Sequence, residues 1–277
     1  MDEKLRQLQL SETRLLEQII EYFDQHDIRY FAMAGTLLGT VRHEGFIPWD
    51  DDIDIGVPRE DYERFLEIAA GEDCPFVSCE YRLGNNPYGY PLKIKDKHVS
   101  LKRKVGENIV VEPAWVTVFP LDGMPANALA RTFHKWNLLM KRYRFYYVRS
   151  FHLFEKNQKS LSPLKRFAAN LALKFNSEAK REQKMDKSYK AVDRALKKYP
   201  YKDSRYLVTL FGGYKFKEMF DKVHYQDGVM AKFEDISIRI PVDSDFVLRQ
   251  LYGDYMTPPK EENRSGGHGL IDVIVNE

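Results

Sequence analysis

The sequence predicts an α+β protein in which a mixed sheet is flanked by helices and interrupted by a helical, basic insertion. Short apolar segments with strand spacing alternate with amphipathic helical segments at both ends of the chain. Between them, residues 126–205 have a helical pattern rich in Lys and Arg. With 277 residues and 43% apolar content, the chain can form a sizeable core. We therefore expect a core over residues 1–125, an insertion over residues 126–205, and a C-terminal part, residues 206–277, that completes the core.

The N-terminal part predicts a helix and then two strands that each lead into a helix. Residues 5–26 carry apolar side chains at helical spacing, with Ser11 as an alternative start of the helix. Residues 28–33 predict a short buried strand, and the helix after it opens at Gly35. Residues 53–57 predict a second strand, which ends at a proline before an amphipathic helix over residues 60–70.

The other predicted strands lie on both sides of the helical region. They are expected at residues 76–81, 92–95, 99–104, 110–119 and 233–241, with an interruption at Pro113. Residues 126–200 predict helices that break at Ser162-Pro163, and residues 243–251 predict a short helix. The tail PPKEENRSGGHG is expected to be a loop.

The composition excludes several classes of protein. The formal net charge of +2 gives no polyelectrolyte character that would favour nucleic acid as a partner. Two cysteines are too few for a disulfide framework, so we expect reduced thiols and a cytoplasmic protein. The charged N-terminal segment is unlike a signal peptide, and no apolar run approaches the about 18 residues of a membrane span.

Positive charge is concentrated in one region. Residues 131–190 contain 16 Lys and Arg against 4 Asp and Glu, so the rest of the chain is net acidic. Within this region the segment HKWNLLMKRYRFYYVRSF mixes cations with large apolar side chains, which suits a helix lying on an anionic membrane surface. A basic outer face on a packed helical subdomain explains the pattern equally well. RNA binding is a third interpretation, without a recognised RNA module to support it.

Four aspartates crowd the start of the second strand, in the segment GFIPWDDDIDIGVPRED at residues 45–61. Because alternate side chains of a strand share a face, Asp52 and Asp54 point the same way, and Asp50 joins them if the strand starts early. Asp51 is expected to point away. Convergent carboxylates suit a hard divalent cation such as Mg²⁺ or Mn²⁺, and a solvated acidic turn is the alternative.

A Gly-Thr pair, Gly35-Thr36, precedes this acidic strand by about 15 residues. It follows a predicted strand and stands at the start of a helical segment. A backbone that turns at Gly and presents N–H groups at a helix start suits phosphate. The two parts together predict a site in which one half holds a phosphate and the other a metal ion.

The segment AGTLLGTVRHEGFIPWDDDIDIGVPREDYERF, residues 34–65, resembles the signature of the LicD family in the nucleotidyltransferase-fold superfamily. Superfamily members combine a Gly-Ser/Thr turn with an acidic-apolar-acidic-apolar strand, matched here by Gly35-Thr36 and Asp52-Ile53-Asp54-Ile55. The stretches VFPLDGMP, residues 118–125, and LYGDYMTPPKEENR, residues 251–264, match as well. The resemblance implies a nucleotidyltransferase-like core.

The resemblance also implies an enzyme, a CDP-choline-dependent phosphocholine transferase. LicD-type proteins transfer phosphocholine from CDP-choline to a sugar hydroxyl of a bacterial surface glycan, such as a teichoic acid precursor or lipopolysaccharide. The similar fukutin-like proteins use CDP-ribitol, so transfer of another CDP-linked group is an alternative. A lipid-linked glycan acceptor would bring a cytoplasmic protein to the inner membrane face, with peripheral contact through the basic helices.

One position departs from the family pattern. The family has an Asp two residues before FPLDG, where this chain has Thr117, so an expected carboxylate is missing. Asp50 is the favoured third acid because it has the parity of the two strand aspartates, while Asp122 and Glu112 are the alternatives. A non-catalytic partner of an active paralogue is the interpretation that this departure leaves open.

The expected site draws on all three matched stretches. Asp50, Asp52 and Asp54 are expected to hold one or two Mg²⁺ or Mn²⁺ ions and to act in catalysis. The expected substrate contacts are Gly35, Thr36, Arg42, His43, Trp49, Asp122, Tyr252, Arg264 and His268. Among these, Arg42 and His43 would add positive charge at the diphosphate, and the aromatic faces would suit the quaternary ammonium of choline. No nucleic acid is expected as a partner.

Overall fold

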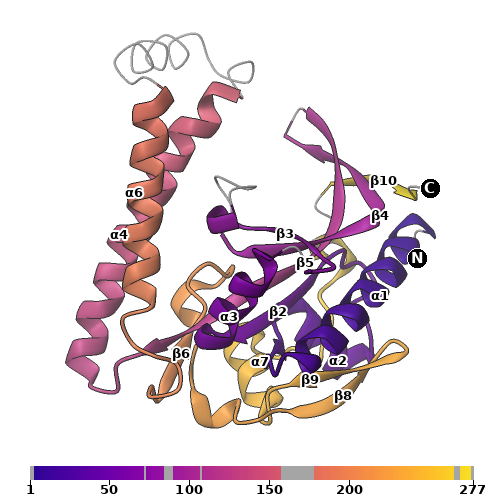
Figure 1. The fold of residues 1–277 in the computed structure, drawn as a ribbon. Helices are drawn as coiled ribbons and strands as arrows, with labels where there is room; N and C mark the ends of the chain where they lie inside the picture. Colours follow the sequence, from indigo (N-terminus) through magenta and orange to yellow (C-terminus); the bar gives the residue numbers. More distant parts are fainter. Residues whose placement is uncertain are drawn as a thin grey trace.

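The computed structural model describes residues 3–71, 73–83, 90–106, 108–156, 178–264 and 269–275, and its fold is α+β, as the sequence predicts. Figure 1 shows a curled mixed sheet with helices packed around it and a pair of long helices standing at one side. Both chain ends lie on the side away from that pair.

The main sheet has eight strands in the described part of the chain. They are β1 (Phe31–Ala32), β2 (Ile53–Pro58), β3 (Val77–Cys79), β4 (Leu92–Val105), β5 (Asn108–Met124), β6 (Tyr206–Val208), β7 (Met219–Asp221) and β10 (Leu270–Val275). The central order is β1-β2-β5-β4-β10, in which β2 and β5 run parallel and the other neighbours antiparallel. Strand β3 adds to β4, and β6 and β7 extend the sheet from β5. A two-stranded hairpin of β8 (Val229–Phe233) and β9 (Ile236–Ile240) is separate from this sheet.

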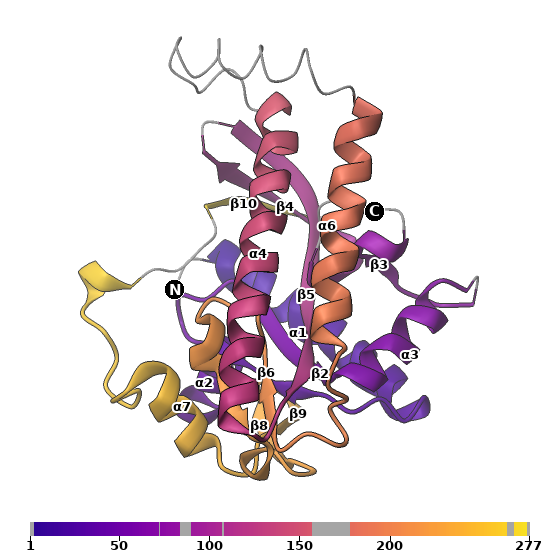
Figure 2. The same ribbon diagram turned by 90° about the vertical axis from the view of Figure 1, so that its left-hand side faces the viewer.

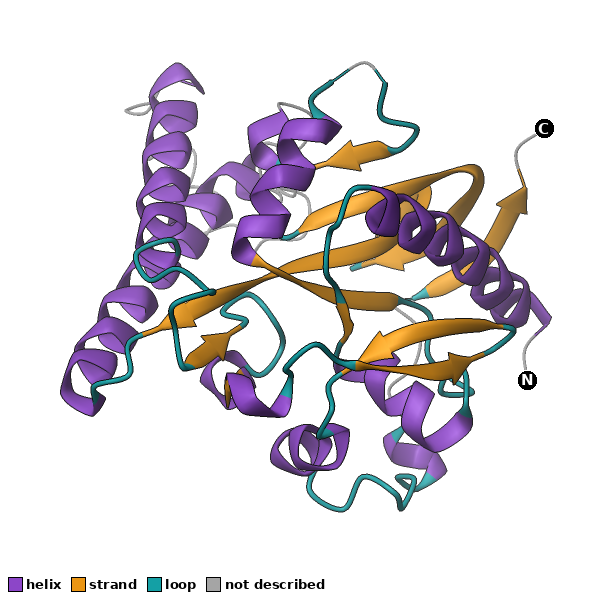
Figure 3. Ribbon diagram, turned by 60° about the horizontal axis from the view of Figure 1, so that its bottom comes forward, coloured by secondary structure: helices purple, strands orange, loops and turns teal. Residues whose placement is uncertain are grey.

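Helices surround the strands, as the purple and orange elements of Figure 3 show. The α-helices are α1 (Glu3–Gln25), α2 (Ala34–His43), α3 (Arg59–Ala69), α4 (Ala128–Lys156), α6 (Glu178–Leu196) and α7 (Ser244–Tyr252). Short 3-10 turns are η1 (Tyr81–Leu83), η3 (Lys215–Glu218), η4 (Lys222–His224) and η5 (Glu261–Asn263). Among the described residues, no helix combines the length and apolar character needed to cross a membrane.

Strand β2 lies in the centre of the main core. Ile53, Ile55 and Val57 are fully buried, which agrees with the predicted alternation along this strand. Burying each such side chain contributes roughly 1.5–3 kcal/mol, so the register of β2 is strongly specified. That register places Asp54 on the face of the sheet opposite Ile53 and Ile55, where it stands next to Thr117 of β5.

The long helices α4 and α6 lie side by side (Figure 2) and share a second apolar core. Leu138 and Phe145 of α4 pack in this cluster with Met185 and Tyr189 of α6. Residues 128–156 and 178–196 are thus helical, as the sequence predicts. The predicted break at Ser162-Pro163 lies outside the described residues.

Pro113 does not interrupt the strand in which it lies. Strand β5 is continuous, and the irregularity falls on its partner β4, where the register shifts between Lys95 and Ser100. Asp96 holds this bulge because its carboxylate accepts hydrogen bonds from the backbone N–H groups of the residues that follow. The predicted strands at residues 92–95 and 99–104 are therefore one bulged strand.

Ser11 is not a helix start either. It lies inside the continuous helix α1, where its buried hydroxyl donates to the carboxylate of Asp96 at 2.9 Å. The strand predicted at residues 28–33 shortens to Phe31–Ala32, and the strand over Leu270–Val275 was not predicted. Both differences depend on pairing partners distant in the sequence.

Candidate active site

A row of polar side chains crosses three neighbouring strands on the face opposite the buried isoleucines. Asp54 of β2 stands opposite Thr117 of β5, which in turn stands opposite Lys93 of β4. The Thr117 hydroxyl donates a hydrogen bond to the Asp54 carboxylate. Thr117 therefore orients a neighbouring acid at the position where the family pattern has a carboxylate of its own.

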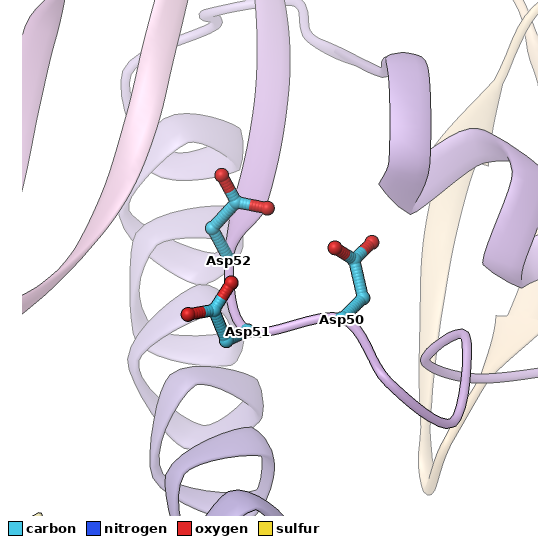
Figure 4. A group of neighbouring side chains, drawn as sticks. All are labelled: Asp50, Asp51 and Asp52. Carbon is cyan, nitrogen blue, oxygen red and sulfur yellow. The ribbon is translucent and has the colours of Figure 1, made fainter. Parts of the chain in front are cut away.

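Three further carboxylates gather where the chain enters β2. Asp50, Asp51 and Asp52 each offer an oxygen atom, and these atoms lie within 4.8 Å of one another (Figure 4). The prediction that Asp51 points away is wrong, because its buried carboxylate belongs to this cluster. The chain is irregular before Ile53, so the alternation of a strand does not extend back to this position.

Asp54 is a partly buried acid beside the cluster. Burial, followed by the charges of Asp52 and Asp50, raises the pKa of the Asp54 carboxyl well above its ordinary value. The hydrogen bond from Thr117 opposes this shift. Its role as a metal ligand stays a prediction, since the group of oxygen atoms that lie together comprises the three preceding aspartates.

Glu12 is a further acid of this site that the sequence did not reveal. It lies on the buried face of α1 and is only 1% exposed, and its Oε2 atom has no hydrogen-bond partner among the described residues. Burial, then the charges of Asp52, Asp51 and Asp50, raise the pKa of the Glu12 carboxyl. The sequence signal that could have identified Glu12 is its position on the apolar face of an amphipathic helix, where an acid is unusual.

These residues fit a hard divalent cation. Carboxylates held this close together repel one another, and the buried Oε2 atom of Glu12, which has no hydrogen-bond partner among the described residues, costs free energy. Oxygen donors alone are the ligand set that Mg²⁺ and Mn²⁺ prefer. A divalent ion at the cluster would relieve both costs.

The Gly-Thr turn is built against the acidic cluster at the start of α2. A Cβ atom added to Gly35 would lie 2.5 Å from Oδ2 of Asp50, so only glycine allows this close approach. Thr36 is buried, and its Oγ1 accepts the backbone N–H of Asp54 at 2.9 Å. The backbone N–H of Met33 donates to the Asp54 carbonyl at 3.0 Å. The turn and the acidic strand therefore hold each other in place.

Replacing Gly35 with Ala is expected to weaken Mn²⁺ binding about 10- to 100-fold, because the new methyl group displaces the Asp50 carboxylate. Asp50 is a flexible side chain that can yield, so the melting temperature should change little. Calorimetric titration with Mn²⁺ and thermal unfolding measure the two effects. Gly213→Ala is the matched control, because a Cβ there meets nothing within 4 Å. Equal Mn²⁺ affinity in both variants would contradict the packing described here.

The predicted contacts from the other matched stretches lie around this centre. Tyr252 is close enough that the charges of Asp50 and Asp54 contribute to the raised pKa of its phenol, after burial and Tyr214. The ring of Tyr252 meets that of Tyr214 edge-on at 5.5 Å between centroids. The guanidinium of Arg264 lies 4.6 Å from the ring centroid of Trp49.

Arg42 and His43 lie at the end of α2. Arg42 donates to the backbone carbonyl of Tyr255 at 2.6 Å and so ties α2 to the segment after α7. Burial, then the charge of Arg42, lowers the pKa of His43. Their contact with substrate stays a prediction, and His268 lies outside the described residues.

Asp122 has a structural role in place of the predicted substrate contact. It is 1% exposed, and both of its carboxylate oxygens accept from Arg59, at 2.6 and 2.9 Å. The β2–β5 register places it beyond the far end of β2 from the acidic cluster. It is therefore also excluded as the replacement for the carboxylate missing at Thr117.

Lys93 is a basic residue of the site, on the strand next to β5. Its Nζ lies 3.4 Å from the ring centroid of Trp115, and burial lowers the pKa of its ammonium to about 8. The charge of Glu112, followed by those of Asp52 and Asp54, opposes this shift, so the ammonium lies within electrostatic range of the acidic centre. At neutral pH it remains a cation.

Glu218 is a second titratable group near the site. It is 3% exposed, and burial raises the pKa of its carboxyl to about 7, although it accepts the backbone N–H of Tyr214 at 2.7 Å. Because the folded pKa lies above the ordinary 4.5, its stabilising contribution is complete below pH 4.5 and is lost as the pH rises through 7.

The loss from Glu218 amounts to about 3 kcal/mol in the free energy of unfolding. In Glu218→Gln this loss is expected to disappear, so the difference in free energy of unfolding between pH 5 and pH 8 should shrink. Urea denaturation at the two pH values measures it. Glu261→Gln, at an exposed side chain, is the control. An unchanged pH dependence in Glu218→Gln would show that the carboxyl titrates normally.

Comparisons with known proteins agree with the resemblance seen in the sequence. Residues 27–88, which include the Gly-Thr turn and the acidic cluster, match the family described as LicD/FKTN/FKRP, nucleotidyltransferase domain. The lipopolysaccharide cholinephosphotransferase LicD of Haemophilus influenzae is 27% identical over 274 residues, which cover 95% of this chain and 97% of that protein. The ribitol 5-phosphate transferase FKRP of Homo sapiens is 40% identical over 54 residues, which cover 20% of this chain and 11% of that protein.

Proposed function

We propose that the chain is a LicD-type phosphotransferase, which transfers phosphocholine from CDP-choline to a sugar hydroxyl of a bacterial cell-surface glycan precursor, of the teichoic acid or lipopolysaccharide type. The observation that carries the proposal is the similarity to a cholinephosphotransferase along nearly the whole chain. The acidic cluster beside a helix N-terminus supports it, because that arrangement suits a metal-bound diphosphate. The acceptor would be lipid-linked, and the chain would act in the cytoplasm at the inner membrane face.

We propose that Asp50, Asp51 and Asp52 hold a Mg²⁺ or Mn²⁺ ion, with Asp54 as the next ligand along the strand. When bound, such an ion neutralises charge on the donor diphosphate and on the departing CMP. Glu12 would sit behind the ligands and add negative charge to the site. The first turn of α2, which contains Gly35, offers backbone N–H groups to a phosphate oxygen.

The transfer itself requires a nucleophile, a leaving group and a proton acceptor. A sugar hydroxyl attacks the phosphorus that carries choline, so a P–O bond to the sugar forms as the P–O bond to CMP breaks. The CMP phosphate takes the electron pair, and the hydroxyl proton passes to an aspartate of the cluster or to water. Lys93 supplies positive charge opposite Thr117 while the pH stays below about 8.

Choline carries a quaternary ammonium, which aromatic faces recognise. Tyr252 and Tyr214 meet edge-on beside the acidic centre and are the best placed rings for this contact. Trp49 is less available, because Arg264 already stacks on its ring. Negative charge from Asp50 and Asp54 near Tyr252 would favour a cationic group further.

Two alternatives have specific observations behind them. Similarity to a ribitol 5-phosphate transferase over 54 residues favours a CDP-linked polyol as donor. Thr117 in place of a carboxylate favours a non-catalytic partner that binds nucleotide without turning it over.

Calorimetric titration with CDP-choline, CDP-ribitol and CMP, each with and without Mn²⁺, separates these alternatives. CDP-choline is expected to bind most tightly, and only with Mn²⁺ present. Tighter binding of CDP-ribitol would favour the polyol donor. Binding of CDP-choline without any CMP release in the presence of acceptor would favour the non-catalytic partner.

A further inference from the structure

Helix α4 exposes a continuous stripe of large apolar side chains. Its members, with their exposed fractions, are Leu129 (67%), Phe133 (67%), Trp136 (63%), Met140 (65%), Tyr143 (71%) and Tyr147 (54%). Steps of four and three residues alternate along this apolar stripe, so the six side chains share one face of the helix. The opposite face, with Leu138 and Phe145, is already buried against the rest of the protein. A contiguous exposed apolar surface of this length indicates an interaction site.

The neighbouring helix α6 carries a parallel row of cations. The exposed members of this basic row are Lys180, Lys184, Lys187, Lys190 and Arg194, and Lys198 continues it in the turn after the helix. Their spacing also keeps them on one helix face. The two helices lie side by side (Figure 2), and Lys190 and Arg194 of the basic row line an open cavity together with Lys141 of α4, so the basic row and α4 share one surface.

An open cavity of about 750 Å³ lies between the two helices. Its lining includes five basic side chains, Lys141 from α4, Lys190 and Arg194 from α6, and Lys197 and Lys198 from the turn that follows α6. Asp193 is the acid of this lining. The cavity therefore adds an anion-binding volume beside the apolar stripe.

Charge complementarity decides which partner fits this surface. Residues 128–154 contain no Asp or Glu, so two copies of α4 packed along their stripes would bring like charges together. An anionic lipid surface instead matches both rows. Phosphate headgroups would meet the lysines and arginines, and the Trp, Tyr and Phe side chains would enter the interface region that such residues prefer.

We propose that the apolar stripe of α4 and the basic row of α6 dock the protein on the surface of an anionic lipid bilayer. The apolar side chains would lie at the boundary between headgroups and acyl chains, and the cavity would take a lipid phosphate. No spanning segment is needed for this contact. The proposal depends only on the side chains exposed on this surface. It is therefore independent of which CDP-linked donor the protein uses.

Vesicle sedimentation of the full chain tests the docking surface. Vesicles of phosphatidylglycerol and phosphatidylcholine are compared with pure phosphatidylcholine at low and high salt. Binding is expected on the anionic vesicles at low salt, with a fall at high salt. Trp136→Ser combined with Met140→Ser should weaken that binding about tenfold or more. Lys187→Gln combined with Arg194→Gln should weaken binding to the anionic vesicles several-fold and reduce its salt dependence.

The matched control is Ile109→Ser combined with Val111→Ser. These side chains are as exposed as the apolar stripe, at 62% and 57%, but lie on β5. This variant should bind like the wild type. Equal binding by the α4 variant, or no binding to anionic vesicles at low salt, would overturn the proposal. So would a dimer in sedimentation equilibrium that the α4 variant dissociates, because the stripe would then be an interface between copies.

Discussion

Replacing Asp52 with Asn is expected to lower CMP release from CDP-choline about 100- to 1,000-fold or more while the protein stays folded. Asp52 is the largest charge contribution to the raised pKa values of both Glu12 and Asp54, so it lies at the centre of the acidic group. The amide keeps the shape of the side chain but removes one negative charge. Without metal, the variant should therefore melt at a higher temperature than the wild type, because repulsion among the carboxylates falls.

Thermal unfolding in EDTA and in Mn²⁺, together with CMP release, measures these effects. The rise in melting temperature on adding Mn²⁺ should be smaller in Asp52→Asn than in the wild type. Asp203→Asn, at an exposed position, is the control for the loss of one carboxylate. Normal turnover by Asp52→Asn, or an unchanged Mn²⁺ response, would refute the metal assignment.

Replacing Arg59 with Met is expected to lower the free energy of unfolding by about 3–5 kcal/mol. Arg59 is 4% exposed and pairs with both oxygens of Asp122, and it also donates to Glu63 and to the Tyr90 hydroxyl. Its loss leaves Asp122 as a buried charge without its cation. For a chain of this size the melting temperature should fall by roughly 10 °C.

The double variant Arg59→Met with Asp122→Leu separates the two causes of that loss. Because it removes both charges, it should recover a large part of the lost stability. Arg64→Met is the matched control, since its pair with Asp61 is half exposed and is expected to contribute less than about 1 kcal/mol. Equal losses in Arg59→Met and Arg64→Met would show that the buried pair has no special role.

The sequence predicts a helix or strand best where the local spacing of apolar side chains alone determines which face is buried. The alternation around Ile53 and Ile55 gave β2 its register, and with it the face on which Asp54 lies. Two features are not predicted from the sequence, the strand Leu270–Val275 and the continuity of β5 through Pro113. Both depend on pairing with β4. Such pairing joins distant segments and leaves no local pattern.

The same distinction holds for the site. The aspartates and the Gly-Thr turn were visible as motifs, and the structure brings Gly35 against Asp50. Glu12 and Glu218 were missed because each belongs to a segment without a motif and reaches the site only through the fold. Asp122 is predicted to contact substrate because the stretch that contains it matches the family. In the structure its carboxylate accepts hydrogen bonds from Arg59.

Metal-dependent release of CMP tests the central claim most directly. The wild-type chain is incubated with CDP-choline, CDP-ribitol or CDP-glycerol, in Mn²⁺ or in EDTA, with a lipid-linked glycan acceptor. Fast CMP release from CDP-choline, abolished by EDTA and slower with the two polyol donors, is the expected result. CMP release that is unaffected by EDTA, or fastest with CDP-ribitol, would contradict metal-dependent phosphocholine transfer.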